Sequence, residues 1–375
     1  MRLRIVTLTQ LALRLAPCRV KVTQRHRRDP SPCYNSAVKI AVPDNNPKTR
    51  ILVTGGAGYI GSHVVKQLGE AGHAVTVLDN LSTGRREAVL SGELVVGELG
   101  DGALLDTILS RGQFDAVMHF AGSIVVPESV TDPLKYYANN TANTLELLGA
   151  CVRHGVERFI FSSTAAVYGM ADQALVSEDD PLAPINPYGA SKMMSERMLA
   201  DVAAAHPLKY VILRYFNVAG ADAGGRLGQS GAGASHLIRV ACQTALGMRP
   251  EMTIYGDDYP TPDGTCIRDY IHVEDLAEAH LQALTYLQRG GDSATLNFGY
   301  GRGRSVREVI EAVKQVSGVD FAVRVGERRA GDPARLVAAN ARLKAAFGWQ
   351  PRGTTLDEIA RAALTWEKRL LATTS

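Results

Sequence analysis

The stretch RILVTGGAGYIGSHVVKQLGEAGHAVTVLDN, residues 50–80, decides the fold that we expect for this chain. It begins with a short apolar strand over residues 51–53, which runs into a cluster of glycines. A helical pattern follows to about residue 71, and a second apolar strand covers residues 74–78. A strand, a tight turn, a helix and another strand in such close succession predict the first unit of a parallel sheet with helices on its faces.

The glycine cluster predicts a dinucleotide site. Gly55, Gly58 and Gly61 stand between the strand and the helix. There they permit a tight turn, the approach of a pyrophosphate to the backbone, and close packing of the helix on the strand. The free N–H groups at the helix N-terminus then face the phosphates. Asp79, at the end of the second strand, can accept hydrogen bonds from ribose hydroxyls and repel a 2′-phosphate, which favours NAD over NADP.

The alternation of strands and helices continues beyond this stretch. Residues 114–122, 156–169 and 208–220 are each expected to hold one buried strand, and residues 143–155 form an amphipathic helix that ends at a glycine. We therefore expect an α/β fold, namely a Rossmann-type doubly wound parallel sheet with a smaller C-terminal α/β substrate lobe.

The length of 375 residues suits about two domains at roughly 150 residues each. We expect an NAD-binding domain over residues 49–220, with some later segments returning to it, and a lobe that mainly binds the substrate over residues 221–375. Residues 1–48 hold ten Lys and Arg residues against two acids. We interpret them as a basic, disordered leader or a start-codon artefact; organelle targeting and a functional basic arm are the alternatives.

Composition excludes several classes of protein. Apolar residues make up 46% of the chain and charged residues 21%, which excludes a disordered chain, and no apolar run is long enough for a membrane span. The five cysteines lack a CxxC spacing, which argues against structural zinc or a disulfide framework and favours the cytoplasm. Without the leader the chain is mildly acidic and no histidines form an HxxxH or HxH pair, so we expect no nucleic-acid partner and no metal.

A second motif, PYGASKMMSE, carries Tyr188 and Lys192, which are four residues apart and so share one face of a helix. A tyrosine with a pKa of about 10 is a poor base at neutral pH, but a nearby ammonium and a positively charged nicotinamide favour the phenolate. Ser162, Ser163 and Thr164 come at the end of an expected strand, where ligands bind in sheets of this kind. Together these residues predict a general base that acts on a sugar hydroxyl.

These segments resemble a known family. The motifs TGGAGYIGSH, HFAG, SSTAAVYG and PYGASK are similar to those of the extended short-chain dehydrogenase/reductases, and YFNVAGA and YGDDYPTPDGTCIRDYIHV are more specific to the UDP-glucose 4-epimerases. The resemblance covers residues 50–370. It implies that UDP-galactose and UDP-glucose are interconverted through a transient 4-keto sugar, with tightly bound NAD. It also implies a homodimer. The segments 143–155 and 195–206 are candidate interface helices, and burial of both against the sheet is the alternative.

The resemblance further implies roles for single residues. Tyr188 is the implied base for the sugar 4-hydroxyl, Lys192 lowers the pKa of Tyr188, and Thr164 hydrogen-bonds the 4-oxygen. The implied NAD contacts are Gly55, Gly58, Tyr59, Ile60, Gly61, Asp79, Asn80, Glu98, Leu99, Phe120, Ala121, Gly122, Asn139, Ser162, Tyr188, Lys192 and Tyr215. The implied UDP-sugar contacts are Thr164, Asn217, His236, Leu237, Tyr255, Arg268, Arg329 and Asp332.

The chain departs from the family pattern at four positions, one of which is Thr164, where a serine is often found and the hydroxyl is kept. Ile124 stands where many members have a lysine, so one contact to the cofactor is lost or supplied otherwise. Glu98 replaces the usual aspartate after the third strand, which leaves the adenine contact to Glu98, Leu99 or Asp101. Leu336 stands where some members have a bulky tyrosine, and a smaller residue there leaves room for a 2-acetamido group.

Other activities share much of this pattern. A sugar-nucleotide 4,6-dehydratase needs an additional acid and base beside the threonine, where this chain has Ala165 and Ala166. A non-catalytic NAD-binding regulator is expected to have lost Tyr188 or Lys192, and both are present. A 4-epimerase of another UDP-sugar (UDP-xylose/UDP-arabinose, UDP-glucuronate or UDP-N-acetylglucosamine) would keep almost every motif, so this alternative stays open.

Overall fold

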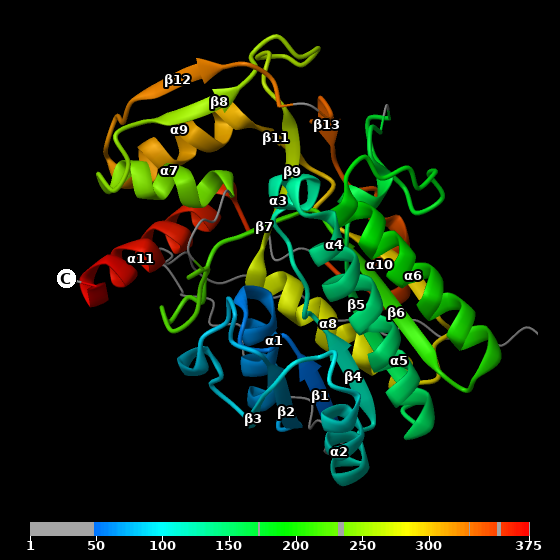
Figure 1. Cartoon of the computed structure of the whole chain (residues 1–375). Helices are drawn as coiled ribbons and strands as arrows, with labels where there is room; N and C mark the ends of the chain where they lie inside the picture. The colour runs from blue at the N-terminus through cyan, green and yellow to red at the C-terminus, as the bar shows by residue number, and fades with distance from the viewer. Residues whose placement is uncertain (1–48, 172, 232–235, 330, 351–353, 375) are drawn as a thin grey trace, which may run out of the picture. The chain divides into compact units, whose positions relative to one another are not determined.

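A computed structural model of the chain describes residues 49–171, 173–231, 236–329, 331–350 and 354–374. The expected leader, residues 1–48, lies outside these described residues. The centre of the described part is a sheet of seven parallel strands in the order β10-β6-β5-β4-β1-β2-β3 (Figure 1). Its strands are β1 (Arg50–Thr54), β2 (Ala74–Asp79), β3 (Glu93–Val96), β4 (Ala116–His119), β5 (Arg158–Thr164), β6 (Lys209–Tyr215) and β10 (Ala294–Phe298).

Helices cover both faces of this sheet, so the expected doubly wound Rossmann-type fold is confirmed. On one face lie α1 (Tyr59–Glu70), α8 (Val273–Gln288) and α10 (Ala341–Phe347), and on the other lie α2 (Gly102–Gly112), α5 (Asn143–Arg153) and α6 (Pro187–Ala205). Successive side chains of a strand point to opposite faces. Leu52 and Phe159 therefore pack toward α2, α5 and α6, whereas Val53 and Ile160 pack toward α1 and α8. Within the described residues, no helix is both long and apolar enough to cross a membrane.

After β6 the chain builds a smaller lobe from short strands and three further helices. Strand β9 pairs with β7, β11 and β13, and β8 pairs with β12. The helices pack around apolar side chains such as Ile238, Val313 and Leu364. The elements of the lobe are β7 (Asn217–Ala219), α7 (Leu237–Ala245), β8 (Met252–Tyr255), β9 (Ile267–His272), β11 (Gly303–Ser305), α9 (Val306–Ser317), β12 (Val323–Gly326), β13 (Arg335–Leu336) and α11 (Leu356–Thr374).

The single strand expected within residues 208–220 is wrong, because the structure has two strands there. β6 ends at Tyr215 in the main sheet, and the N–H of Phe216 donates to the carbonyl of Phe298. β7 then pairs with β9 of the smaller lobe. The chain therefore passes from one sheet to the other at Phe216. Short helical segments complete the described part: η1 (Arg86–Ala88), α3 (Val126–Thr131), α4 (Pro133–Tyr136), η2 (Tyr137–Ala142) and η3 (Ala165–Tyr168).

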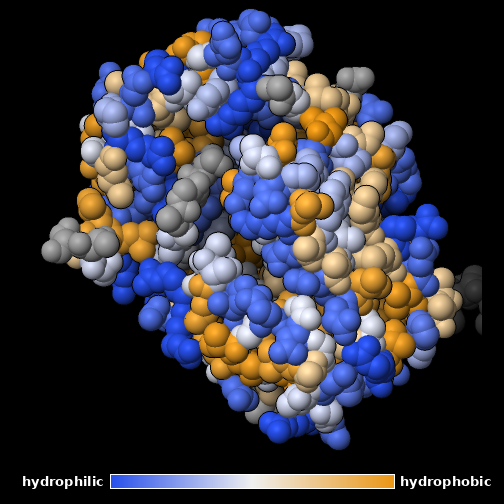
Figure 2. Space-filling view, viewed as in Figure 1, coloured by the Kyte–Doolittle hydropathy of each residue, from blue (hydrophilic) through white to orange (hydrophobic). Residues whose placement is uncertain are grey.

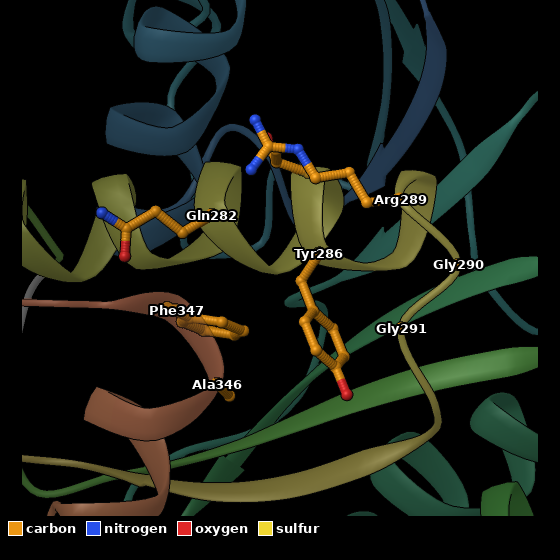
Figure 3. A pocket seen from close by; sticks show the side chains of 8 residues that line it. Gln282, Tyr286, Arg289, Gly290, Gly291, Ala346 and Phe347 are labelled. Carbon is orange, nitrogen blue, oxygen red and sulfur yellow. The ribbon is translucent and has the colours of Figure 1, made fainter. Parts of the chain in front are cut away.

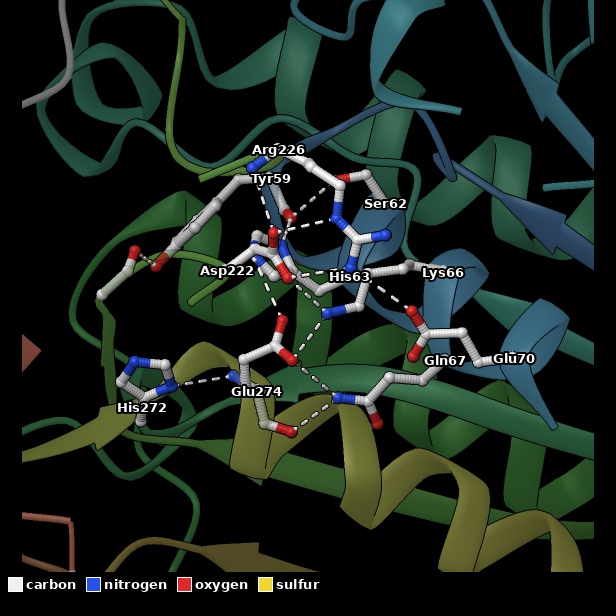
Figure 4. Close-up of polar contacts among 11 residues, drawn as sticks. Tyr59, Ser62, His63, Lys66, Gln67, Glu70, Asp222, Arg226, His272 and Glu274 are labelled. Atoms are coloured by element: carbon white, nitrogen blue, oxygen red, sulfur yellow. Dashed lines mark hydrogen bonds and ion pairs between the residues drawn. The ribbon is translucent and has the colours of Figure 1, made fainter. Parts of the chain in front are cut away.

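A cluster of buried charges joins α1 to the segment after β7 and to the start of α8 (Figure 4). Lys66 Nζ donates to Asp222 Oδ1 at 2.7 Å and to Glu274 Oε2 at 2.8 Å. Asp222 also accepts from Arg226, whose Nε lies 3.2 Å from Oδ2. The Lys66 side chain is only 6% exposed. Removing it would therefore leave two carboxylates in a poorly solvated place without their shared cation.

We expect Lys66→Met to lower the free energy of unfolding by about 3–5 kcal/mol, because a buried ion pair that loses one partner leaves an uncompensated charge. Urea denaturation measures this change. Lys209→Met is the matched control, since Lys209 pairs with Asp292 at a site where the two side chains are 56% and 90% exposed. This control should cost less than about 1 kcal/mol. Equal losses in the two variants would contradict a structural role for the cluster.

Candidate active site

The glycine turn between β1 and α1 is packed tightly against the start of α1 and the residues that follow β4. Gly55 has a φ of +72°, and a Cβ there would lie 2.5 Å from the amide nitrogen of Ala121. A Cβ on Gly61 would lie 2.3 Å from the carbonyl oxygen of Gly55. Both positions therefore require glycine, and the start of α1 is held directly against the turn. This bare backbone at a helix N-terminus fits the pyrophosphate of a dinucleotide.

The carboxylate of Asp79 lies at the C-terminal end of β2, beside the turn. Its Oδ2 accepts the N–H of Ala57 at 2.9 Å and its Oδ1 accepts the N–H of Leu81 at 2.8 Å. Each oxygen keeps a lone pair for a further donor, so the group fits the predicted role at the ribose. Asn80 Nδ2 donates to Glu98 at 3.1 Å, and Leu99 is buried.

Three of the predicted NAD contacts, Phe120, Ala121 and Gly122, directly follow β4, which pairs with β1 in the sheet. The N–H groups of Phe120 and Ala121 both donate to the carbonyl of Thr54 in β1. A Cβ on Gly122 would lie 3.5 Å from Nζ of Lys192, so the bare backbone of Gly122 passes close to that ammonium. Asn139 Nδ2 donates to the hydroxyl of Ser123 at 3.0 Å. The segment that follows β4 therefore lies close to Lys192, the lysine of the PYGASKMMSE motif.

The structure brings Tyr188, Lys192 and Thr164 together. Tyr188 and Lys192 lie in the first turns of α6, which begins after Asn186, whose side chain accepts the N–H of Gly189 at 2.8 Å. Lys192 Nζ donates to the carbonyl of Ser162 at 3.0 Å. The side chain of Thr164 lies close enough to the Tyr188 hydroxyl to offer it a hydrogen bond, and its Oγ1 accepts the N–H of Ala166 at 3.1 Å. Both contacts meet the last residues of β5, at the carboxyl ends of the strands.

Burial dominates the electrostatics of this group. It raises the pKa of Tyr188, and the hydrogen bond with Thr164 acts in the opposite direction. Burial also lowers the pKa of Lys192 to about 8, partly opposed by the charge of Glu196. His119, which hydrogen-bonds Thr54 Oγ1 at 2.6 Å, has its pKa lowered to about 3 by burial. This histidine is therefore neutral at physiological pH, and Lys192 supplies the positive charge beside Tyr188.

Tyr215 lies at the end of β6, opposite Thr164 in the sheet register. Its hydroxyl is 2.5 Å from Nε2 of His280, and Nδ1 of that histidine is 2.8 Å from the carbonyl of Leu276. Nδ1 therefore carries the proton and Nε2 accepts from Tyr215. Burial raises the pKa of Tyr215 and lowers that of His280 to about 4, so both groups stay neutral.

The predicted UDP-sugar residues form two contacting pairs. Arg268 Nη2 in β9 donates to Asp332 Oδ1 at 3.2 Å, and the Arg329 guanidinium lies 3.8 Å from the centre of the Tyr255 ring. A Cβ on Gly331 would lie 2.9 Å from Ile185, three residues before Tyr188. Gly331 therefore lies close to the segment that leads into α6.

The other predicted substrate residues lie on separate elements. Asn217 is exposed at the start of β7, two residues beyond Tyr215. His236 and Leu237 lie at the N-terminus of α7, where Nδ1 of His236 is 2.8 Å from Nε2 of Gln229. The role of this helix end in binding the substrate stays a prediction.

Sequence reasoning missed several polar residues beside the site. Asn140 is 1% exposed, accepts the N–H of Ser123 at 2.7 Å, and donates to Ser191 Oγ at 3.0 Å. It sits in the π-helical turn η2, and such turns are frequent at functional sites. Tyr136 packs edge-on against Tyr188, with ring centres 6.4 Å apart. Only the spacing of Glu196, four residues after Lys192, gave a signal that could have been read from the sequence.

A groove of about 400 Å³ lies elsewhere, between α8 and α10 (Figure 3). The rings of Tyr286 and Phe347 meet on its wall, with centres 5.7 Å apart. The groove is lined by Gln282, Thr285, Tyr286, Arg289, Gly290, Gly291, Ala346 and Phe347. None of the residues predicted to bind NAD or the UDP-sugar is among them, so the groove is separate from the candidate site.

Comparison with known proteins assigns the chain to a family. A model of the NAD dependent epimerase/dehydratase family matches residues 51–299. The chain therefore belongs to this family. The family is NAD dependent, so the expected cofactor is confirmed.

Single relatives extend the likeness over most of the chain. A UDP-glucose 4-epimerase of Azospirillum brasilense is 58% identical over 322 residues, which cover 86% of this chain and 92% of that protein. The crystal structure of UDP-glucose 4-epimerase from Brucella ovis in complex with NAD is 46% identical, with a TM-score of 0.82, and the match covers 84% of this chain and 97% of that one. The UDP-Glc/GlcNAc 4-epimerase of Campylobacter jejuni is 50% identical, with a TM-score of 0.76, covering 86% and 99%. These findings confirm the resemblance stated from the sequence motifs.

We expect Gly61→Ala to lower the NAD content of the purified protein at least about tenfold, because a Cβ there meets the backbone of the turn at 2.3 Å and must push α1 away from it. Chromatography of nucleotide released by acid measures the content. Gly149→Ala is the control, since a Cβ there meets only the flexible end of Arg153, at 3.3 Å. Wild-type NAD content in Gly61→Ala would contradict the assignment of the turn.

Proposed function

We propose that this chain is a UDP-glucose 4-epimerase, which interconverts UDP-galactose and UDP-glucose and keeps its NAD bound throughout. The observation that carries the proposal is the contact of Tyr188, Lys192 and Thr164 at the end of β5, next to a dinucleotide turn. The relative of Azospirillum brasilense, 58% identical over most of the chain, has this name.

Tyr188 acts as the base in the proposed reaction. It removes the proton of the sugar 4-hydroxyl and later returns it, so the protein gains or loses no proton over the cycle. Thr164 orients the 4-oxygen by a hydrogen bond. NAD, when bound, supplies the hydride acceptor for C4 and a positive charge close to the tyrosine. That charge and the ammonium of Lys192 offset the burial that raises the pKa of Tyr188.

The UDP group anchors the substrate while the sugar turns. Arg268 and Arg329 are the proposed donors to the diphosphate, because a guanidinium suits phosphate oxygens. Asp332, which is paired with Arg268, is the proposed contact of the uridine ribose, and Tyr255 lies by the uracil. Firm contacts to UDP and few contacts to the hexose allow the 4-keto sugar to present its other face, so that C4 is inverted.

A homodimer in the cytoplasm is the proposed state of the protein. One side of α5 and of α6 packs on the sheet, while Leu145 on α5 and Met194 on α6 are 55% and 41% exposed. Leu134 on the adjoining α4 is 78% exposed, and Figure 2 shows apolar side chains gathered over this region. A second copy of the face would cover them. Free buried cysteines such as Cys151 and Cys242 support a reducing compartment.

The direct test is NMR of the purified protein with UDP-galactose and no added NAD. We expect UDP-glucose to appear and the mixture to reach a constant ratio. Turnover only after NAD is added would keep the chemistry and reject tight retention of the cofactor. No turnover in either case would favour a 4-epimerase of UDP-xylose/UDP-arabinose or UDP-glucuronate. The same assay with UDP-N-acetylglucosamine tests whether the site has space for a 2-acetamido group beside Leu336.

We expect Tyr188→Phe to reduce kcat by about 10²–10⁴-fold, the usual contribution of a positioned general base. Binding of UDP, measured by calorimetry, should stay unchanged because the hydroxyl faces the sugar. Tyr210→Phe is the control, since Tyr210 lies near the start of β6, away from the strand ends, and it should keep full activity. A Tyr188→Phe enzyme with more than half the wild-type kcat would rule out this residue as the base.

We expect Leu145→Glu combined with Met194→Glu to convert the dimer to a monomer, because two buried carboxylates per copy would face an apolar surface. Analytical ultracentrifugation measures the state. Val319→Glu is the control, since Val319 is 42% exposed in the smaller lobe, and it should leave the dimer intact. A double variant that still sediments as a dimer would move the interface to another face.

A further inference from the structure

Glu196 lies one helical turn beyond Lys192 on α6, and its side chain is only 6% exposed. Its carboxylate is fully engaged. Arg214 donates from Nη2 to Oε2 at 2.6 Å and from Nε to Oε1 at 3.0 Å, which is a two-point ion pair. The hydroxyl of Ser163 donates to Oε1 in a short hydrogen bond.

These partners come from two neighbouring strands. Ser163 in β5 and Arg214 in β6 stand opposite each other in the parallel register. Both side chains point toward the face covered by α6, as the contacts with Glu196 require. A single carboxylate therefore ties the ends of two adjacent strands to the helix that carries Tyr188 and Lys192.

The hydrogen bond from Ser163 to Glu196 joins α6 to β5 between two residues of the site. Ser163 stands between Ser162, whose carbonyl accepts from Lys192 at 3.0 Å, and Thr164, whose side chain lies close to the Tyr188 hydroxyl. Three consecutive residues of β5 thus contact three residues of α6 spaced four apart. Moving Ser163 would shift both neighbours relative to the helix.

The carboxylate also acts on the charge of Lys192. The charged and titratable groups that act on that ammonium are Glu196 on α6 and His119 on β4, and the ring of Phe161 in β5 lies 4.9 Å from its Nζ. His119 is neutral, and Arg214 offsets part of the carboxylate charge through the ion pair. Glu196 is the group that favours the charged lysine against its burial.

We propose that Glu196 is a positioning residue for the epimerase reaction: it holds the end of β5 in register with α6 and keeps Lys192 charged beside Tyr188. A need for stability explains it less well, because a buried ion pair is often no more stabilising than an apolar pair of similar volume. The proposal rests on the proposed function, and it adds a residue that touches neither sugar nor cofactor.

The test is Glu196→Gln in the full chain, assayed for UDP-galactose conversion across pH 6–10. Without the carboxylate, Arg214 is left as an unpaired cation and Lys192 loses its proton more easily. We expect kcat to fall about 10-fold to 100-fold, with the KM for UDP-galactose changed less than about twofold. We also expect the alkaline limb of the kcat profile to move to lower pH by about one unit.

Glu367→Gln is the matched control. Glu367 accepts from Arg239 Nε at 2.6 Å, and these side chains are 2% and 10% exposed, so a second buried Arg–Glu pair is broken in the smaller lobe. This variant should lose a similar amount of thermal stability without moving the alkaline limb. An alkaline limb that stays in place in Glu196→Gln, or moves equally in Glu367→Gln, would overturn the proposal.

Ser163→Ala separates the positioning of β5 from the effect on the charge of Lys192. It removes the hydrogen bond between β5 and Glu196 and leaves every charge in place. We expect a lower kcat with the alkaline limb where it is in the wild type. If Ser163→Ala keeps full kcat, the positioning role is wrong. Should the wild-type enzyme itself fail to convert UDP-galactose, the proposed function fails first, and the two failures are thereby distinguished.

Discussion

The parallel alignment of β1, β4, β5 and β6 is the constraint on which the rest of the structure depends. These strands run in one direction, so their carboxyl ends meet at one edge of the sheet. Gly55, Ala121, Thr164 and Tyr215 follow or end these strands. Residues as much as 160 positions apart in the chain are thereby brought to one edge of the sheet, and the helices add the groups that act there.

Burial at that edge sets the charge of each group. His119 and His280 are buried and neutral, so neither competes with Lys192 for a role as the local cation. Burial works against Lys192 as well, which makes its charge sensitive to Glu196. The site thus depends on a balance between desolvation and a few paired charges, and not on a large positive field. A base as weak as Tyr188 suits such a site, because its proton is returned in the same cycle.

Local sequence patterns were sufficient to predict the glycine turn, the Tyr188–Lys192 helix and most strand positions. Each depends on a pattern within one element, such as the run of buried apolar residues in β5 or the four-residue step on α6. The pairing of Arg268 with Asp332 and of Glu196 with Arg214 could not be predicted. These contacts join different elements, and side chains that are 64 and 18 residues apart carry no local pattern. The passage from β6 to β7 was missed for another reason: residues 208–220 form one continuous, largely apolar stretch, which predicts a single strand.

Small and polar residues make up the buried side of α6 in its first turns. Between Gly189 and Glu196 its buried residues are small or polar, and Leu199 is the first large apolar side chain among its buried residues. Apolar packing has little directional preference and tolerates small shifts, whereas a hydrogen bond weakens steeply with distance and angle. Ser195, which donates to the carbonyl of Asn140 at 3.0 Å, and Glu196 therefore define the helix position more sharply than burial alone would. Directional contacts therefore help to hold the helix in the turns that carry Tyr188 and Lys192, and large buried apolar side chains begin only at Leu199.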